Sequence, residues 1–140
     1  MIAKEYLKQI QAIHTKIENK KERIERLDGL LTSPAVGELK QDKVQTSIRL
    51  DKQESMIAQK QSLEDELQRL MYEEAALIIK IGKQIDGMEN PTYSRILHLR
   101  YEESCSFEII ADKMNKDIRY IWNLHGLALK AFDDAYTKKV

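Results

Sequence analysis

The side chains best suited to binding chemistry lie near the carboxyl end of the chain. Arg119 and Asn123 stand one helical turn apart, and arginine pairs well with guanine edges and asparagine with adenine edges. On a helix these two residues share a face with Gly126 and Lys130. The opposite face is formed by Ile121, Leu124, His125, Ala128 and Phe132, which we expect to be core. The pattern favours DNA contact, and an ordinary solvated helix face is the alternative.

Other residues near this face suit contacts that carry no base information. Basic side chains that could meet phosphates are Arg100, Lys113, Lys116 and Lys130. Tyr120 is a further candidate DNA-binding residue, because an aromatic ring can stack on nucleic acid. We expect Trp122, with Ile118 and Leu129, to pack on the preceding helix or on the N-terminal arm.

No catalytic or metal-binding pattern stands beside this candidate surface. His14, His98 and His125 are scattered, and none has metal-ligand spacing with Cys105 or with another histidine. The chain has neither a glycine-rich phosphate loop nor a nucleophile elbow. We therefore expect no enzyme, no metal and no cofactor.

Local signals predict the elements that carry the candidate residues. Ser106 suits the N-cap of a helix over 107–114, and Asp117 suits the N-cap of a helix from Ile118 to about Phe132. Between them Asn115 tolerates the positive φ that a tight turn needs. Ala111 lets the two helices approach closely. Two short capped helices separated by such a turn are typical of a helix-turn-helix.

The stretch from Tyr93 to Phe132 resembles the C-terminal helix-turn-helix of bacterial sigma factors. It is more similar to a phage-encoded family of RinA/ArpU-like transcription regulators. The markers are Leu99-Arg100-Tyr101, Ser106 to Ala111, Ile118 to Trp122, and Leu124 to Leu129, with Asp42 to Ser47 farther upstream. The resemblance implies a coiled-coil N-terminal half, a DNA-reading C-terminal half and a role in transcription. Sigma-like domains carry glycine at the place of Asn115 and an acidic residue at the place of Ile109.

Ahead of this region the chain predicts long helices, and the fold class is all-α. Residues 1 to about 31 place apolar side chains at heptad spacing, with Lys20 as the polar interruption. Pro34 breaks the helix, and a second helix from about Val44 to about Ile85 carries a broad stripe that includes Met71 and Ile78. The two helices must pair as an antiparallel hairpin, between chains, or both. The candidate oligomerisation residues are Ile10, Ile13, Ile17, Ile24, Leu27, Leu63, Leu67 and Leu70.

We therefore expect residues 1–90 to form an association arm and residues 91–140 to form the helix-turn-helix domain. The whole chain has 23 basic and 23 acidic residues, which excludes a general nucleic-acid coat. Residues 91–140 hold eight basic and seven acidic residues, a net charge of +1. Because phosphate neutralisation dominates affinity for DNA, a single copy should bind weakly and gain from pairing.

The remaining expectations concern location and partners. One cysteine excludes an internal disulfide, and no apolar run reaches the roughly 18 residues of a membrane span, so we expect a cytoplasmic protein in a bacterial host. The leading hypothesis is a homo-oligomeric DNA-binding regulator that could also contact host RNA polymerase. The alternative is a module that binds a host protein, with the helix-turn-helix as a relic. A structural component of the virion is a third hypothesis.

Overall fold

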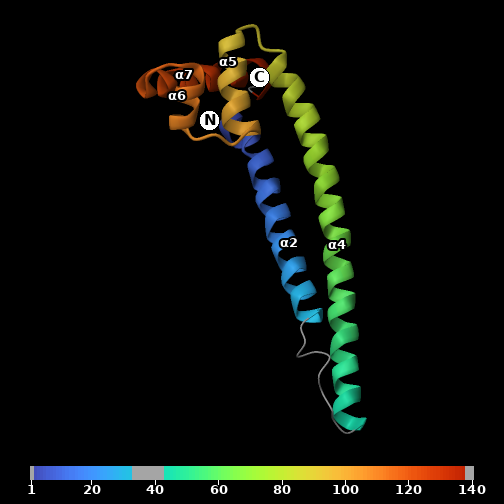
Figure 1. Ribbon diagram of the computed structural model, residues 1–140. Coiled ribbons are helices and arrows are strands. Elements are labelled where there is room, and N and C mark those ends of the chain that lie inside the picture. Colours follow the sequence, from blue (N-terminus) through green and yellow to red (C-terminus); the bar gives the residue numbers. More distant parts are fainter. Residues whose placement is uncertain (1, 33–42, 138–140) are drawn as a thin grey trace. The chain divides into compact units, whose positions relative to one another are not determined.

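The computed structural model describes residues 2–32 and 43–137, and all of its regular elements are helical, which confirms the all-α class. The described elements are α1 (Ile2–Leu7), α2 (Gln9–Leu31), α4 (Lys43–Asp86), α5 (Pro91–Leu97), the π-helical turn η1 (His98–Glu102), α6 (Phe107–Met114), α7 (Ile118–Phe132) and the π-helical turn η2 (Asp133–Thr137) (Figure 1). The break predicted around Pro34 lies outside the described residues.

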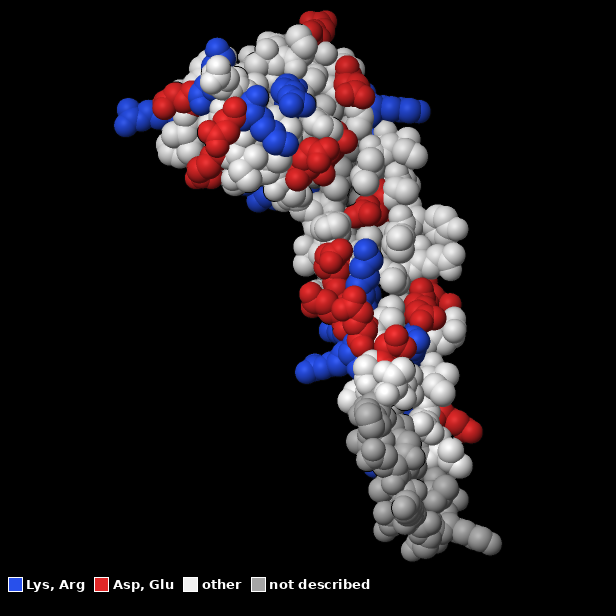
Figure 2. Space-filling model, viewed as in Figure 1, with Lys and Arg blue, Asp and Glu red and all other residues white. Residues whose placement is uncertain are grey.

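The described chain divides into two compact units, one of which comprises residues 15–72. In this unit α2 and α4 lie side by side and antiparallel (Figure 1). Lys20 Nζ lies 2.6 Å from Glu66, and Lys60 Nζ lies 2.6 Å from Asp28, so the order of contacts runs in opposite directions on the two helices. The hydrogen bond from Lys20 lowers the pKa of Glu66, and the hydrogen bond to Asp28 raises the pKa of Lys60. Acidic and basic side chains intermingle on the visible face (Figure 2).

The predicted apolar seam lies at this pairing within the chain. Ile17 is buried, and the other seam positions of the unit are half-buried: Ile24, Leu27, Leu63, Leu67 and Leu70. Lys20, the predicted interruption, is also half-buried, with its ammonium on Glu66. The seam residues therefore hold α2 to α4 in one chain, which is the hairpin among the arrangements that the sequence left open.

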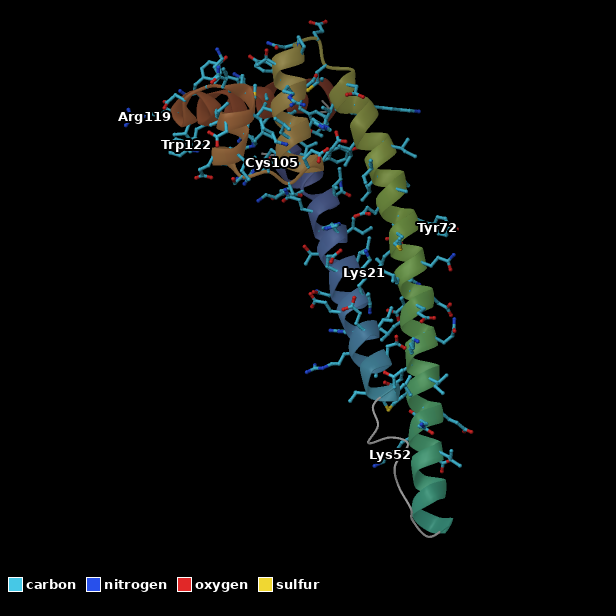
Figure 3. The ribbon with its side chains drawn as sticks, viewed as in Figure 1. Lys21, Lys52, Tyr72, Cys105, Arg119 and Trp122 are labelled. Atoms are coloured by element: carbon cyan, nitrogen blue, oxygen red, sulfur yellow. The ribbon has the colours of Figure 1, made fainter. Side chains whose placement is uncertain are left out.

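The stripe predicted for the second helix is too broad. Met71 and Ile78 were expected to share it, but both are exposed, at 48% and 40%. Tyr72, next to Met71, points away from α2 (Figure 3). The reason is geometric: a pair of helices covers only a narrow strip of each, so residues one position beyond the seam turn to solvent.

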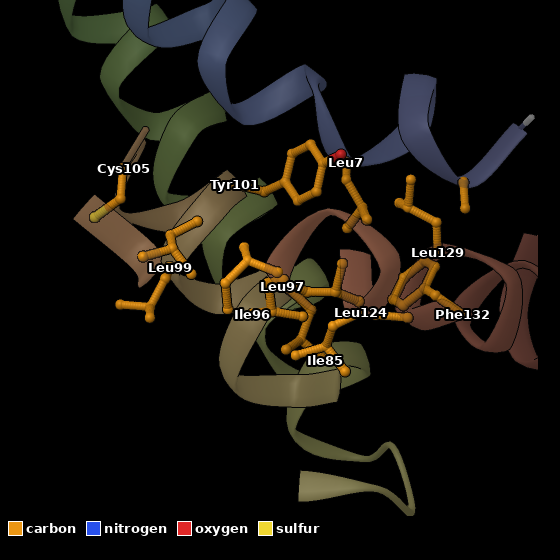
Figure 4. Packing of buried hydrophobic residues seen from close by; sticks show 14 of the residues in the cluster. Leu7, Ile85, Ile96, Leu97, Leu99, Tyr101, Cys105, Leu124, Leu129 and Phe132 are labelled. Atoms are coloured by element: carbon orange, nitrogen blue, oxygen red, sulfur yellow. The ribbon is translucent and has the colours of Figure 1, made fainter. Parts of the chain in front are cut away.

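The other compact unit comprises residues 1–14 and 73–140, and it contains the main apolar core (Figure 4). Leu7 from α1, Ile85 from α4, Ile96 and Leu97 from α5, and Phe132 from α7 are fully buried together. The backbone N–H of Ala3 donates to Asp133 at 3.1 Å, and Tyr6 Oη donates to Gln84 at 2.6 Å. The start of the chain and the end of α4 are therefore built into the same core as the C-terminal helices.

This division differs from the predicted boundary between residues 90 and 91. Residues 2–14 and 73–86 belong with the C-terminal helices, because Ala3, Leu7, Ile81 and Ile85 have no exposed surface and share the core with Ile121. Sequence periodicity places such residues on a helix face but does not say which partner covers that face.

The first helix also departs from the predicted continuous run. It is interrupted at Lys8, between α1 and α2. Gln9 Nε2 donates a hydrogen bond to the Tyr6 carbonyl oxygen at 2.9 Å. In an uninterrupted helix that carbonyl would accept from a backbone N–H, so the side chain competes with the helix hydrogen bond. The interruption lies next to Leu7, which is fully buried in the core.

Candidate nucleic-acid interface

The helices α6 and α7 begin and end where the predicted capping residues lie. Ser106 Oγ accepts from the Ile109 N–H at 3.3 Å, and Asp117 accepts from the Arg119 N–H at 3.3 Å. Asn115 has φ 55° and ψ 50°, the left-handed conformation that ends α6. The N–H of Lys116 then donates to the Ala111 carbonyl at 3.0 Å, which closes the helix end. A three-residue turn thus fixes the direction of α7 relative to α6.

The faces of α7 separate as the sequence predicts. Its buried residues are Ile121, Leu124, Ala128, Leu129 and Phe132. Arg119, Asn123, Gly126 and Lys130 are all exposed on the other side. An added Cβ at Gly126 would meet nothing within 4 Å, so this position is open to whatever approaches α7. The exposed face of α7 therefore carries the guanidinium of Arg119, the amide of Asn123 and the ammonium of Lys130, and it has no side chain at Gly126.

The turn before α7 adds basic and aromatic groups to this surface. Lys113 and Lys116 are exposed, and Lys116 Nζ lies 5.5 Å from the centre of the Tyr120 ring. Tyr120 is itself 45% exposed. Lys116 and Tyr120 thus form one contact pair at the amino end of α7, the end at which Arg119 lies (Figure 3).

Arg100 lies in a different setting from the other predicted phosphate contacts. It belongs to η1, where its guanidinium donates to the Cys105 carbonyl at 3.0 Å and lies 4.1 Å from the centre of the Phe107 ring. These contacts hold the loop that leads into α6. Its role toward phosphate stays a prediction, and its role in joining η1 to α6 is what the structure shows.

Behind the exposed face, His125 has the inward orientation that the sequence predicts. Its Nε2 lies 2.7 Å from Tyr101 Oη, and its ring meets Phe107 edge-on, with centroids 5.0 Å apart. Burial lowers the pKa of His125 to about 4, with Arg100 and Lys4 adding to the effect. Burial likewise raises the pKa of Tyr101 to about 12. The pair is therefore neutral and links α7 to η1.

Trp122 was expected to pack on the preceding helix or on the N-terminal arm, but it is one of the exposed large apolar residues. Its side chain is 52% exposed, whereas Leu129 is buried and Ile118 lies against the core. Trp122 falls one position outside the strip of α7 that its neighbours cover, so its ring remains at the surface beside Arg119 (Figure 3).

Sequence reasoning missed a second apolar residue at this surface. Leu127 is 54% exposed and lies beyond Asn123, where it borders a hollow at the start of α5. The hollow is lined by Asn90, Thr92, Tyr93, Tyr120, Asn123, Leu124 and Leu127. The signal available was the four-residue step from Asn123 to Leu127, which places both on adjacent parts of one helix face.

Charge over the C-terminal helices is mixed. Exposed basic residues of α6, α7 and their turn alternate with the exposed acidic residues Glu108, Asp112 and Asp117. The visible face shows the same intermingling of the two signs (Figure 2). The exposed basic residues of these described helices therefore do not make a continuous positive field.

Within 2–32 and 43–137 no three His, Cys, Asp or Glu side chains are grouped so that they could hold a metal ion. Cys105 is a free, buried thiol. In these ranges no helix has the length and apolar character needed to cross a membrane.

Comparison with known proteins adds no relative: no protein-family model, no curated protein and no solved structure matches this chain.

Proposed function

We propose that this chain is a phage-encoded, DNA-binding transcription regulator. In this proposal α6 and α7 form a helix-turn-helix, and α7 lies in the major groove of double-stranded DNA. Association of the chain through its N-terminal helices, as a coiled-coil oligomer, supplies more than one copy of α7. The resemblance of residues 93–132 to phage regulators and sigma factors supports the proposal.

One observation carries it. A left-handed Asn115 and two capped helix starts leave Arg119 and Asn123 exposed on the face of α7 opposite the core. In a major groove these two side chains are long enough and chemically suited to read guanine and adenine. Lys116 and Lys130, exposed near either end of the same face, would contact phosphates.

The weak net charge sets the conditions of the test. Residues 91–140 carry a net charge of +1, so binding to phosphates gives each copy little affinity, and the few phosphate contacts should make that affinity fall only moderately with salt. Fluorescence anisotropy of the full chain against labelled fragments of the phage genome, at several salt concentrations, measures both affinity and preference. We expect one fragment to be preferred, and equal binding to every fragment at low salt would contradict the proposal.

Substitution separates base reading from general attraction. Arg119→Ala combined with Asn123→Ala should abolish the preference, since each bidentate contact discriminates by about 1–3 kcal/mol. Helix content should not change, because both side chains are exposed. Arg69→Ala, which removes an exposed guanidinium from α4, is the matched control and should leave the preference intact.

A second candidate function rests on the exposed apolar side chains. Trp122 and Leu127, at 52% and 54% exposure, lie on opposite sides of the polar face of α7. Exposed aromatic and aliphatic residues of this kind are common anchors in protein interfaces. In this alternative the C-terminal helices bind a host protein such as RNA polymerase.

Purified host RNA polymerase separates the two functions. If the alternative holds, the full chain co-elutes with the polymerase, and Trp122→Ala combined with Leu127→Ala abolishes that binding. Arg119→Ala combined with Asn123→Ala would then have no effect on the complex. If instead Arg119→Ala combined with Asn123→Ala abolishes binding to a DNA fragment, and Trp122→Ala combined with Leu127→Ala does not, the result supports a regulator that reads DNA directly.

A further inference from the structure

Leu127 is an exposed apolar side chain beside the face of α7 that carries Asn123. It is 54% exposed. At about 100° per residue, it lies about 40° around the helix from Asn123 and one turn farther along it. Lys130, which is also exposed, follows on the same side. A large apolar side chain therefore lies between an amide and an ammonium, where a merely solvated helix face favours a polar residue.

Leu127 also borders the hollow at the start of α5, whose volume is about 280 Å³. All of the residues that line it belong to the compact unit of residues 1–14 and 73–140. Asn90 Oδ1 accepts from the backbone N–H groups of Thr92 and Tyr93, at 2.9 and 3.4 Å, so the α5 wall begins at a fixed place. The α7 wall consists of Tyr120, Asn123, Leu124 and Leu127. The hollow thus gives Leu127 free space on the side of α7 that bears Asn123.

The major groove of DNA presents few groups that an apolar side chain can contact favourably. Guanine, adenine and cytosine present hydrogen-bond donors or acceptors there, whereas thymine adds its C5-methyl group. A leucine against a donor or acceptor removes water from that group without replacing the hydrogen bond, which costs affinity. Against the methyl group, the same side chain buries apolar surface on both partners. Of the four bases, thymine is therefore the one that suits Leu127.

We propose that Leu127 contacts the C5-methyl group of a thymine that lies one or two base pairs from the adenine read by Asn123. The proposal rests on the function proposed above, in which α7 lies in the major groove. One helical turn advances about 5.4 Å along α7, and successive base pairs are about 3.4 Å apart. The step from Asn123 to Leu127 therefore covers between one and two base pairs. The hollow beside Leu127 provides the space that the methyl group enters.

The setting of Leu127 suits a single methyl group better than an apolar protein surface. Trp122 is exposed on the same helix, but it lies about 140° around α7 from Leu127. A partner protein that bound both side chains would also cover Arg119, Asn123 and Lys130, which lie between them, and would have to pair with each. In DNA, bases and phosphates supply those pairings, and the thymine methyl group adds the apolar contact.

Replacing thymine by uracil tests the contact, because it removes the C5-methyl group and leaves base pairing unchanged. The probe is the preferred genome fragment, with each thymine replaced in turn, and fluorescence anisotropy of the full chain gives the dissociation constant. We expect one thymine for each bound copy of α7 to be sensitive. Its replacement should raise the dissociation constant by about 4-fold, because one buried methyl group is lost. If no single replacement changes the dissociation constant, the proposal is wrong.

A double-mutant cycle assigns the methyl contact to Leu127. Leu127→Ala should weaken binding to the thymine fragment by about 4-fold without abolishing it, and should bind the thymine and uracil fragments equally. Leu127→Met keeps an apolar side chain of similar size and should retain the penalty for uracil. The position is exposed, and alanine and methionine favour helices, so helix content should hold. A Leu127→Ala protein that keeps the full penalty would overturn the assignment.

Trp122→Ala is the matched control for this cycle. It removes a large apolar side chain of similar exposure, 52%, from the other side of the polar face of α7. The variant should keep the full penalty for uracil. Loss of the penalty in this variant as well would contradict a specific contact between the methyl group and Leu127.

The position of the sensitive thymine tests the alignment of α7 in the groove. Replacing adenine by 7-deazaadenine removes the N7 acceptor that an asparagine side chain uses. The adenine read by Asn123 is the one whose replacement weakens binding of the wild-type chain but not of Asn123→Ala. We expect the sensitive thymine one or two base pairs from that adenine. A sensitive thymine in the same base pair, or more than two base pairs away, would contradict the proposed alignment.

The outcomes separate this inference from the function on which it rests. If the chain prefers no genome fragment, the proposed function and the methyl contact both fail. If one fragment is preferred and uracil binds as well as thymine at every position, Leu127 does not contact a methyl group. In that case the recognition of DNA by Arg119 and Asn123 is unaffected.

Discussion

At the scale of single residues, Gly126 is where stability and the proposed DNA binding favour different residues. A glycine inside a helix costs roughly 0.5–1 kcal/mol relative to alanine, and nothing near Gly126 would clash with an added Cβ. Gly126→Ala should therefore raise the unfolding free energy by about that amount in denaturant titrations. If α7 lies against DNA as proposed, the same methyl group obstructs the approach, and affinity for the preferred fragment should fall.

Gly29 provides the control for this prediction. It also lies in a helix, α2, with no atom within 4 Å of an added Cβ. Gly29→Ala should be neutral or stabilising and should leave DNA affinity unchanged. A Gly126→Ala protein that is more stable and binds DNA as well as wild type would argue that this face of α7 is only solvated.

The Tyr101–His125 pair makes stability depend on pH. The folded pKa of His125 is lowered from 6.5 to about 4, mainly by burial. Below about pH 6.5 the unfolded chain binds a proton that the folded chain does not, so stability is present at neutral pH and is lost as pH falls from about 6.5 toward 4. Because the ring is only half-buried, we expect a loss on the order of 1 kcal/mol between pH 7 and pH 5.

Urea unfolding at pH 7 and pH 5 measures this loss. His125→Gln keeps an acceptor for Tyr101 and removes the titrating ring, so the variant should lose less stability than wild type over that interval. His14 and His98 remain in both proteins and cancel in the comparison. An identical pH response of variant and wild type would show that His125 does not carry the dependence.

At the scale of elements, Asn115 sets the angle between α6 and α7. Its φ of 55° is unfavourable for most side chains, by about 1–2 kcal/mol. Asn115→Ala should therefore lower the unfolding free energy by about 1 kcal/mol, whereas Asn115→Gly should stay within a few tenths of wild type. Thermal unfolding followed by circular dichroism checks the order, and equal stability of the two variants would contradict it.

The same elements show what sequence can and cannot predict. The helix starts at Ser106 and Asp117 and the turn at Asn115 were predictable because caps and positive φ depend on residues within one turn. The exposure of Trp122, Met71 and Ile78 was not, because periodicity gives an apolar face but not the width that a partner helix covers. The hollow beside Leu127 is lined by residues at the start of α5 and by residues of α7, and no local sequence pattern specifies that these two helices lie together.

At the scale of the whole molecule, the division of the chain depends on contacts between its two ends. The charge balance and heptads predicted an arm over 1–90 and a reading domain over 91–140. The core instead recruits α1 and the end of α4, since Leu7 and Ile85 are fully buried among α5 and α7 residues. The helix that carries the candidate DNA-binding surface thus packs against residues that are far from it in the sequence.

That dependence gives the last prediction. Leu7→Ala, at the opposite end of the chain from α7, removes a fully buried side chain from the shared core and should cost about 2–5 kcal/mol. The loss should appear in hydrogen exchange as faster exchange of the α7 amides, and the proposed DNA preference should weaken with it. Leu30→Ala, at a leucine that is 49% exposed in α2, should change stability by no more than about 0.5 kcal/mol. If α7 kept its protection in the Leu7→Ala protein, residues 91–140 would have to fold on their own, and the predicted boundary at residue 90 would be the right one.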